Sequence, residues 1–171
     1  MANTTLIVMA GLPGSGKSTV ANELARRLTA PVLSIDPIEA AMWRSQISRQ
    51  MTGIAAYEIA AAIAEENLKI GISVIIDAVN PVKAARSTWV QLSERQNVRL
   101  QFIECSCSDI SVHRQRIEAR VRNIPGMPEI PWSRVEERKA EYEQWDFDHV
   151  TFDTASMSPD AIVADLMQRF R

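Results

Sequence analysis

Hydrophobic residues occur along this chain in two arrangements that alternate from one end to the other. Short continuous apolar runs are typical of strands buried on both faces of a parallel sheet, whereas apolar residues spaced three or four apart are typical of a helix with one buried face. The runs predict strands at residues 6–10, 31–35, 73–77, 98–105 and 149–153. Because helical patterns separate them, we expect an α/β fold of three layers, with a five-stranded parallel sheet and helices on both faces.

The segments between the predicted strands are expected to form helices, and several of them begin at residues that favour helix starts. Apolar residues recur every four positions from Val20 to Leu28 and indicate a helix after the first strand. Further helices are predicted at residues 36–48, 52–71, 80–96, 108–122 and 133–145, and from Ser158 onward. Asp36, Asn80 and Ser133 are the expected N-caps, because short polar side chains accept hydrogen bonds from the first free backbone N–H groups.

A loop rich in proline interrupts the last third of the chain. Residues 123–132, NIPGMPEIPW, contain three prolines and one glycine. Arginines surround this loop: Arg114, Arg116, Arg120, Arg122, Arg134 and Arg138. Two helix ends joined by a mobile tip would form a lid, approximately residues 114–138, and a lid keeps water away from a reacting group. The alternative is that most of these arginines belong to solvated helix faces with glutamate partners.

Composition and charge narrow the class of protein. A chain of 171 residues with 46% hydrophobic residues can bury the core of one domain, residues 1–171. The net charge of −2 argues against nucleic-acid binding, which usually needs a positive field. Cys105 and Cys107, the two cysteines, are too close for an easy disulfide and match no zinc-binding spacing. Reduced thiols and the lack of a long apolar run predict a cytoplasmic protein without a membrane-spanning segment.

The first predicted strand leads directly into GLPGSGKST, which matches the phosphate-binding pattern G-x-x-x-x-G-K-[ST]. Glycine lets backbone N–H groups point at phosphates, and the next helix presents its positive N-terminus to the same anion. Lys17 is expected near the β and γ phosphates, and the Ser18 hydroxyl is suited to ligate Mg²⁺. The expected nucleotide-binding residues here are Gly11, Pro13, Gly14, Ser15, Gly16, Lys17, Ser18 and Thr19. The position between a buried strand and a helix argues against a glycine turn that binds nothing.

The remaining residues favour phosphoryl transfer over hydrolysis or switching. The guanine-reading string N-K-x-D and the switch string D-x-x-G are absent, and Ala78 follows Asp77 where a motor ATPase usually has a second acid. Asp36 and Asp77 follow the second and third strands, at the edge where open parallel sheets bind ligands. A carboxylate there could accept the proton of an acceptor hydroxyl, although Asp36 could equally be only a helix cap. Arg86, on the helix after Asp77, faces either the cleft or solvent.

Taken together, these motifs resemble the P-loop small-molecule kinases, in the branch that contains polynucleotide kinase, chloramphenicol phosphotransferase and zeta-toxin-like kinases. The resemblance rests on the P-loop, SID after the second strand, VIIDAVN after the third, the Arg-rich lid and the final DTASMSPDAIV. It implies the strand order 2-3-1-4-5. It also implies that Lys17 and Ser18 hold phosphate and Mg²⁺, and that Asp77 is a metal ligand, directly or through water.

The same resemblance assigns the catalytic groups. Asp36 would be the carboxylate that activates the acceptor, and Arg120 or Arg116 would be the catalytic lid arginine, with Arg120 also binding the nucleotide. Thr154, after the last strand, would border the adenine. Polynucleotide kinases tend to carry an arginine three residues after the aspartate, and Glu39 stands there instead, which argues against a nucleic-acid acceptor.

The segment between the second and third strands is expected to grip the acceptor. It offers Met42, Trp43, Arg44, Arg49, Met51 and Tyr57, which form a mostly apolar wall that suits a compact alcohol if they are not simply core. The sequence therefore predicts an ATP-dependent kinase, acting with Mg²⁺ on a small-molecule alcohol, as a monomer or homodimer. The alternatives are a nucleotide-dependent switch or accessory ATPase acting on RNA or protein, and a polynucleotide 5′-hydroxyl kinase.

Overall fold

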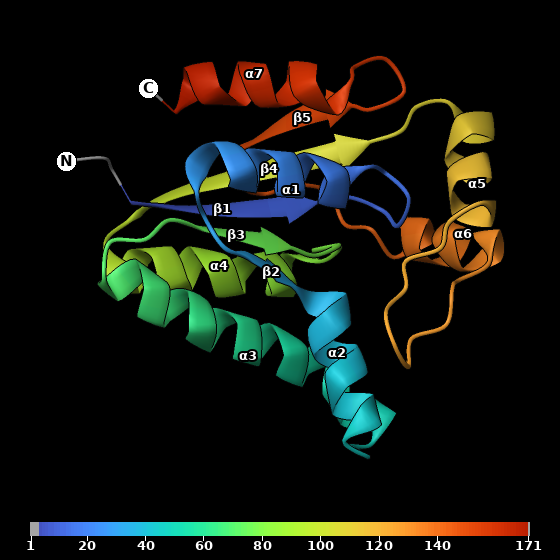
Figure 1. Ribbon diagram of the computed structural model, residues 1–171, viewed down its shortest axis with the longest axis horizontal. Coiled ribbons are helices and arrows are strands. Elements are labelled where there is room, and N and C mark those ends of the chain that lie inside the picture. The colour runs from blue at the N-terminus through green and yellow to red at the C-terminus, as the bar shows by residue number, and fades with distance from the viewer. Residues whose placement is uncertain (1–3, 171) are drawn as a thin grey trace.

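The computed structural model describes residues 4–170, which build one sheet between two layers of helices (Figure 1). Its strands are β1 Thr5–Ala10, β2 Val32–Ser34, β3 Val74–Asp77, β4 Arg99–Ser106 and β5 His149–Asp153. Every neighbouring pair is parallel, and the order across the sheet is β2-β3-β1-β4-β5. The predicted fold class and strand order are therefore confirmed.

Strand β1 lies at the centre of the sheet, and all of its residues are buried. Leu6 and Val8 belong to the core on one face, and Ile7 and Met9 to the core on the other. Two pairs of helices cover these cores: α1 Lys17–Leu28 with α7 Pro159–Arg169, and α3 Arg49–Lys69 with α4 Lys83–Gln96 (Figure 1). Each fully buried aliphatic side chain of β1 contributes about 1.5–3 kcal/mol, which fixes the register of the central strand.

Three shorter helices gather where the strands end, namely α2 Ile35–Arg44, α5 Ile110–Glu118 and α6 Trp132–Ala140 (Figure 1). Helix α2 follows β2, α5 follows β4, and α6 follows the Pro-rich loop. The carboxyl ends of parallel strands meet at one edge of a sheet, and this edge is the usual ligand-binding position. The three helices surround that edge.

The structure corrects two of the expected helix starts. Ser34 is the N-cap of α2, so Asp36 lies inside the first turn and is not a cap. Helix α6 begins at Trp132 with Pro131 as its N-cap, so Ser133 is inside the helix. The carboxylate of Asp36 instead accepts a hydrogen bond from a lid arginine, a tertiary contact that the local capping pattern does not predict.

Asn80, a third expected N-cap, does not cap a helix but joins separate elements through its side chain. Helix α4 begins at Lys83, and Asn80 has left-handed backbone with φ 49°. Its side-chain amide donates to the Met9 carbonyl at 2.8 Å, and its amide oxygen accepts from the Trp89 indole at 2.9 Å. Asn80 is fully buried and ties the ends of β1 and β3 to helix α4, which local capping patterns cannot indicate.

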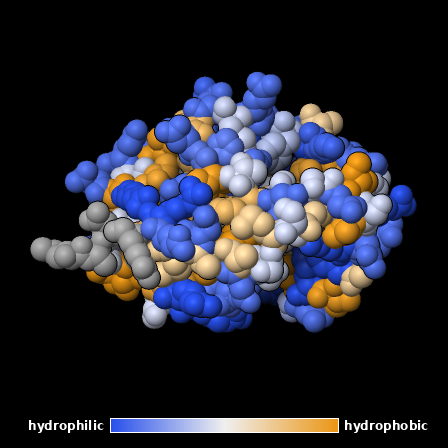
Figure 2. Space-filling model, turned by 90° about the horizontal axis from the view of Figure 1, so that it is seen from above, coloured by the Kyte–Doolittle hydropathy of each residue, from blue (hydrophilic) through white to orange (hydrophobic). Residues whose placement is uncertain are grey.

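Seen from the side of α1 and α7, the surface is mostly hydrophilic, with hydrophobic residues in separate small groups (Figure 2). Across residues 4–170, every helix is too short or too polar to cross a bilayer. Cys105 and Cys107 are both free thiols, as expected from their spacing.

Candidate active site

The loop between β1 and α1 takes a shape that only glycine permits. Gly11 has φ 130°, and a Cβ there would lie 2.1 Å from the Cys105 carbonyl oxygen. Gly16 has φ 87° and is the N-cap of α1. The base of the loop is tied to the segment after β3, because the Gly11 N–H donates to the Val79 carbonyl at 3.1 Å. This strand–loop–helix arrangement is the context that confirms a phosphate-binding loop.

Residues from distant elements brace this loop from behind. The imidazole of His113 on α5 lies 2.8 Å from the Pro13 carbonyl oxygen through Nε2, so that nitrogen carries the proton. Thr154, after β5, places its hydroxyl 2.8 Å from the Ser15 carbonyl oxygen. Both side chains are buried. His113 was not identified from the sequence, because its partner lies a hundred positions earlier in the chain.

A cleft of about 410 Å³ opens beside the loop, at the carboxyl edge of the sheet. From the loop and α1 it is lined by Pro13, Lys17, Ser18 and Asn22, and from the strand ends and α2 by Ser34, Asp36, Glu39, Trp43 and Asp77. The lid contributes Arg120, Arg122, Arg134 and Arg138, with Met127 and Pro128 from its tip. The structure therefore brings together the predicted lysine, both predicted carboxylates and one of the two predicted arginines. Thr19 is exposed but does not line this cleft.

Asp77 provides an oxygen with no protein partner. Its Oδ2 accepts from the Ser34 hydroxyl at 3.0 Å, because these two residues are register partners on β3 and β2. Its Oδ1 is buried and has no hydrogen bond within residues 4–170. An orphaned carboxylate oxygen facing a phosphate loop fits a bound cation or a bound water.

The donor set near Asp77 suits Mg²⁺ better than a transition metal. No cluster of three or more His, Cys, Asp or Glu side chains able to hold a metal occurs in the part of the chain that the structure describes. Mg²⁺ usually keeps several waters and is bound by one or two protein oxygens together with phosphates. The Ser18 hydroxyl and the Asp77 carboxylate, which line the same cleft, fit that pattern.

The lid is held over the cleft by a chain of ion pairs. Arg122 donates through Nη1 to Asp36 at 2.5 Å and through Nε to Glu129 at 3.1 Å, and Arg120 donates to Glu129 at 3.2 Å. Farther along, Arg44 on α2 donates to the Pro125 carbonyl at 2.5 Å. Burial and the neighbouring charge of Arg122 lower the pKa of Arg120 from its ordinary value, although a guanidinium stays protonated in proteins. Its Nη2 is buried and has no partner among the residues that the structure describes, so it is available to an anion in the cleft.

Arg116, the other predicted lid arginine, lies outside the cleft. It donates through Nη1 to the Thr154 hydroxyl at 2.7 Å and through Nη2 to the Thr154 carbonyl at 2.9 Å. It does not line the cleft, whereas Arg120 does. The Arg116 guanidinium therefore clamps the segment after β5 against α5, close to Gly16. Thr154 is buried and faces the rear of the loop.

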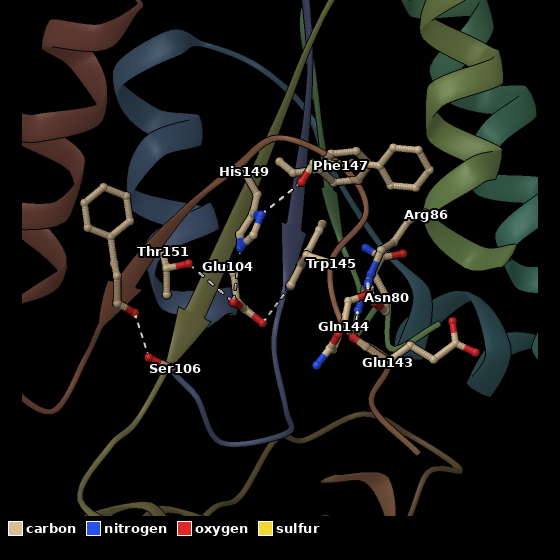
Figure 3. A network of polar contacts seen from close by, with 12 residues as sticks. Asn80, Arg86, Glu104, Ser106, Glu143, Gln144, Trp145, Phe147, His149 and Thr151 are labelled. Carbon is tan, nitrogen blue, oxygen red and sulfur yellow. Dashed lines mark hydrogen bonds and ion pairs between the residues drawn. The ribbon is translucent and has the colours of Figure 1, made fainter. Parts of the chain in front are cut away.

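Arg86 faces neither the cleft nor solvent, so both sequence interpretations of this residue were wrong. It is fully buried, and it donates to the carbonyl oxygens of Asn80, Pro81, Glu143 and Gln144 at 2.9–3.0 Å. The Trp145 ring stacks on its guanidinium at 4.0 Å. Figure 3 shows Arg86 between the segment after β3 and the segment that leaves α6. The network thus joins the exit of the lid to the base of the phosphate loop.

The same network extends to the C-terminal half of the sheet. Glu104 on β4 accepts from the Trp145 indole at 3.0 Å and from the Thr151 hydroxyl at 3.4 Å, with His149 nearby (Figure 3). A second cavity of about 600 Å³ lies behind the phosphate loop, next to Glu104 and Cys105. Burial raises the pKa of the Cys105 thiol to about 12, so that thiol is a packing group.

Comparisons with known proteins agree with this geometry. A proposed kinase from Chloroflexus aurantiacus has 22% identity and a TM-score of 0.77, with 98% of each chain covered. A sugar kinase from Janibacter has 19% identity and a TM-score of 0.70, with 97% of this chain and 93% of that chain covered. Kti12 from Chaetomium thermophilum, solved with ADP-AlF3, has 20% identity and a TM-score of 0.70, with 97% and 99% covered. At such identities the likeness shows a shared fold.

A comparison with curated protein sequences gives no match. Residues 6–145, which contain the phosphate loop, the cleft and most of the lid network, match the family AAA_33, described as an AAA domain. The chain therefore belongs to the AAA_33 family and has the fold of the P-loop kinases, in agreement with the resemblance found in its sequence.

Proposed function

We propose that this protein is an ATP-dependent phosphotransferase that moves the γ-phosphoryl group of ATP, with Mg²⁺, to a hydroxyl of a small molecule. The observation that carries the proposal is the composition of the cleft. Lys17 at one side, the carboxylates Asp36 and Asp77 at the strand ends, and Arg120 on the lid line one space of about 410 Å³. Phosphoryl transfer needs an anion cradle, a proton acceptor and a cation over the transferred group, and these residues supply all three.

The nucleotide would bind through the loop and the start of α1. Backbone N–H groups of the loop and the N-terminus of α1 attract the phosphates, and Lys17 adds a full charge. Mg²⁺, when bound by Ser18 and Asp77, would neutralise charge on the phosphate oxygens. Arg116 and Thr154 lie behind Gly16, so the adenine would border the residues that follow Thr154 in the segment after β5.

The acceptor would react from the side of α2. Its hydroxyl proton passes to the Asp36 carboxylate while the oxygen forms a bond to the γ-phosphorus. The bond between that phosphorus and the β–γ bridging oxygen breaks, and ADP leaves. The unpartnered Nη2 of Arg120 would donate to the oxygens of the transferred group, where charge develops in the transition state. The lid keeps water out of the cleft during this step.

Acceptor-dependent ADP release is the test of this proposal. We expect slow release with MgATP alone and at least about tenfold faster release when a panel of alcohols, sugars and nucleosides includes an acceptor. Lys17→Ala should abolish both rates without lowering the melting temperature, because Lys17 makes no ion pair within residues 4–170. Normal turnover by that variant would rule out the proposed nucleotide site.

A nucleotide-dependent switch or accessory ATPase is the second candidate; Kti12, which has the same fold, was solved with ADP-AlF3. A switch should bind nucleotide tightly and respond to RNA or protein instead of a small alcohol. A polynucleotide 5′-hydroxyl kinase is less favoured, because Glu39 stands at the position where polynucleotide kinases tend to carry an arginine. Labelling of a 5′-hydroxyl oligonucleotide that collapses as salt rises would support that kinase.

A further inference from the structure

The cleft contains more cations than carboxylates. Its charged lining consists of Lys17, Arg120, Arg122, Arg134 and Arg138 against Asp36, Glu39 and Asp77. Three of the arginines have acidic partners: Arg122 has Asp36 and Glu129, Arg120 has Glu129, and Arg134 has Glu137. Lys17 belongs to the phosphate loop. Of these five cations, Arg138 alone has neither an acidic partner within residues 4–170 nor a place in the phosphate loop.

Arg138 is half-buried, yet it has no hydrogen bond and no ion pair to any residue in the described range 4–170. It lies on α6, one turn after Arg134, with Val135 of the same helix buried beneath. A guanidinium that gives up part of its hydration without a protein partner loses free energy unless a ligand replaces the lost water. The environment of the Arg138 guanidinium is therefore suited to binding an anionic ligand.

Arg138 reaches the acceptor end of the cleft, on the side of α2 and α3. Burial raises the pKa of Tyr57 on α3 to about 12, and the charges of Arg138, Asp36 and Glu39 all act on that hydroxyl. Arg138, Asp36 and Glu39 also line the same cleft, so the three charges belong to one site. The lid arginine and the two carboxylates of α2 therefore line one cleft.

The other groups at this end are suited to hydroxyls. Glu39 is oriented by the Thr52 hydroxyl at 2.9 Å, which in turn accepts from the Trp43 indole at 2.8 Å. Ionised carboxylates accept hydrogen bonds from hydroxyl groups, and Trp43 adds an apolar wall to the cleft. A guanidinium, by contrast, pairs best with a carboxylate or a phosphate, often through two parallel hydrogen bonds.

We propose that Arg138 binds an anionic group of the acceptor, so that the acceptor is a small alcohol that also carries a carboxylate or a phosphate. This inference rests on the proposed function and names the substrate class of the same cleft. Arg138 is here a specificity-determining residue, because it touches the acceptor away from the reacting hydroxyl. If Arg138 bound the γ-phosphate instead, its loss would slow transfer to every acceptor equally.

Matched acceptors test the inference. Three pairs differ mainly in the anionic group: D-gluconate with D-sorbitol, D-glycerate with glycerol, and glycerol 3-phosphate with glycerol. We expect kcat/KM of the wild-type protein to be about 10- to 100-fold higher for the anionic member of at least one pair, the usual effect of a charge-assisted hydrogen bond. The carboxylate and phosphate pairs decide which anion is used. Equal rates within every pair that reacts would overturn the inference.

The variant Arg138→Gln should remove this preference by raising KM for the anionic acceptor, with no change for the neutral one. Arg138→Lys should keep part of it. Lys139→Gln is the matched control, because it removes the same charge from the neighbouring position of α6 and does not line the cleft. A loss of the same size for both members of a pair would show that Arg138 serves the nucleotide or the fold.

A binding measurement separates this inference from the proposed function. The protein is saturated with Mg²⁺ and a non-hydrolysable ATP analogue, and D-gluconate, D-glycerate or glycerol 3-phosphate is titrated by calorimetry. Binding that weakens at least tenfold in Arg138→Gln, without transfer to any acceptor, would keep the anion site and reject the kinase activity. Transfer only to neutral alcohols would keep the kinase and reject the anion site. Absence of both binding and transfer for all three anionic probes would reject the inference as well.

Discussion

Arg122 of the lid donates through Nη1 to the Oδ2 of Asp36 on α2 at 2.5 Å, so the lid tip rests on the carboxylate that is proposed to act as base. Glu129 accepts from both the backbone N–H and the Nε of the same arginine, at 2.7 Å and 3.1 Å. Arg122 occupies only Oδ2 of the half-exposed Asp36 side chain, so an acceptor hydroxyl can approach Oδ1, and one that takes Oδ2 must displace Arg122. Because Glu129 remains as a partner, the displaced guanidinium would keep a counter-charge.

Asp36→Asn should separate stability from catalysis. Ser34 is the N-cap of α2, and half of the Asp36 side chain is exposed, so the lost ion pair should cost at most about 1 kcal/mol of unfolding free energy. If Asp36 is the base, kcat should fall about 10²-fold or more. Urea unfolding and ADP release measure the two effects. Asp109→Asn, which alters a true N-cap on α5, should change neither, and full activity of Asp36→Asn would leave Asp77 as the better candidate.

Arg122→Ala should loosen the lid and uncouple ATP use from transfer. The variant loses the contacts to Asp36 and Glu129, which hold residues of the lid tip over the cleft. Water should enter more often, and acceptor-independent ATP hydrolysis should rise several-fold relative to transfer. Arg114→Ala, which breaks only an exposed pair with Glu118, is the control. An unchanged ratio of hydrolysis to transfer would show that the Asp36–Arg122 contact has no part in closing the cleft.

The sequence was sufficient for the features that depend on local pattern. The apolar runs predicted the strands, and the glycine spacing predicted the phosphate loop, because both follow from neighbouring residues. Asp36 and Asp77 were also expected at the cleft, since a residue after a parallel strand lies at the carboxyl edge. The capping pattern predicted the start of α7 correctly, with Ser158 as N-cap, but it was wrong for Asp36 and Asn80, which are engaged by residues far along the chain.

What the sequence could not show depends on partners brought together by folding. Arg116 and Arg120 are four positions apart and were equal candidates for the lid arginine on sequence alone. Helix α5 ends at Glu118, so Arg116 stays on the helix beside Thr154, while Arg120 leaves it and enters the cleft. The burial of Arg86 was also not predictable from the sequence, because the carbonyl oxygens that accept its hydrogen bonds come from two separate segments.

Arg120 and Arg116 should therefore give different kinetic effects when removed. Arg120→Ala should lower kcat about 10²-fold or more with little change in ATP affinity, because its free Nη2 pairs best with charge in the transition state. Arg116→Ala should weaken ATP binding and stability, because it releases Thr154 from the rear of the loop. Single-turnover rates and nucleotide titrations measure these effects. Equal losses of rate and affinity in both variants would contradict the assignment.

Cys105 and Cys107 should react differently with a thiol reagent. The pKa of Cys105 is raised by burial from its ordinary 9.0 to about 12, so its thiol stays protonated and unreactive as pH rises through 8 and 9. Cys107 is partly exposed. Iodoacetamide at pH 8 should modify Cys107 alone in the folded protein and both residues in urea, as measured by peptide mass spectrometry. Rapid labelling of Cys105 without urea would show that the core behind the phosphate loop opens readily.

Removing the buried guanidinium of Arg86 should destabilise the fold far more than removing an exposed one. Arg86→Met would leave the carbonyl oxygens of Asn80 and of two positions after α6 without donors, and the Pro81 carbonyl with only the Glu143 N–H. It would also remove the group that Trp145 stacks upon. We expect a loss of about 3 kcal/mol in urea unfolding, because several charge-assisted hydrogen bonds disappear at once. Arg95→Met on the same helix α4 is the control and should change stability by less than about 0.5 kcal/mol, since its pair with Glu65 is exposed. Arg86→Lys keeps the charge but offers fewer donors in a fixed plane, so it should lie between the two. If Arg86→Met were as stable as the wild type, the segments after β3 and α6 would have to be held by other contacts, and the route from lid to phosphate loop would not pass through this residue.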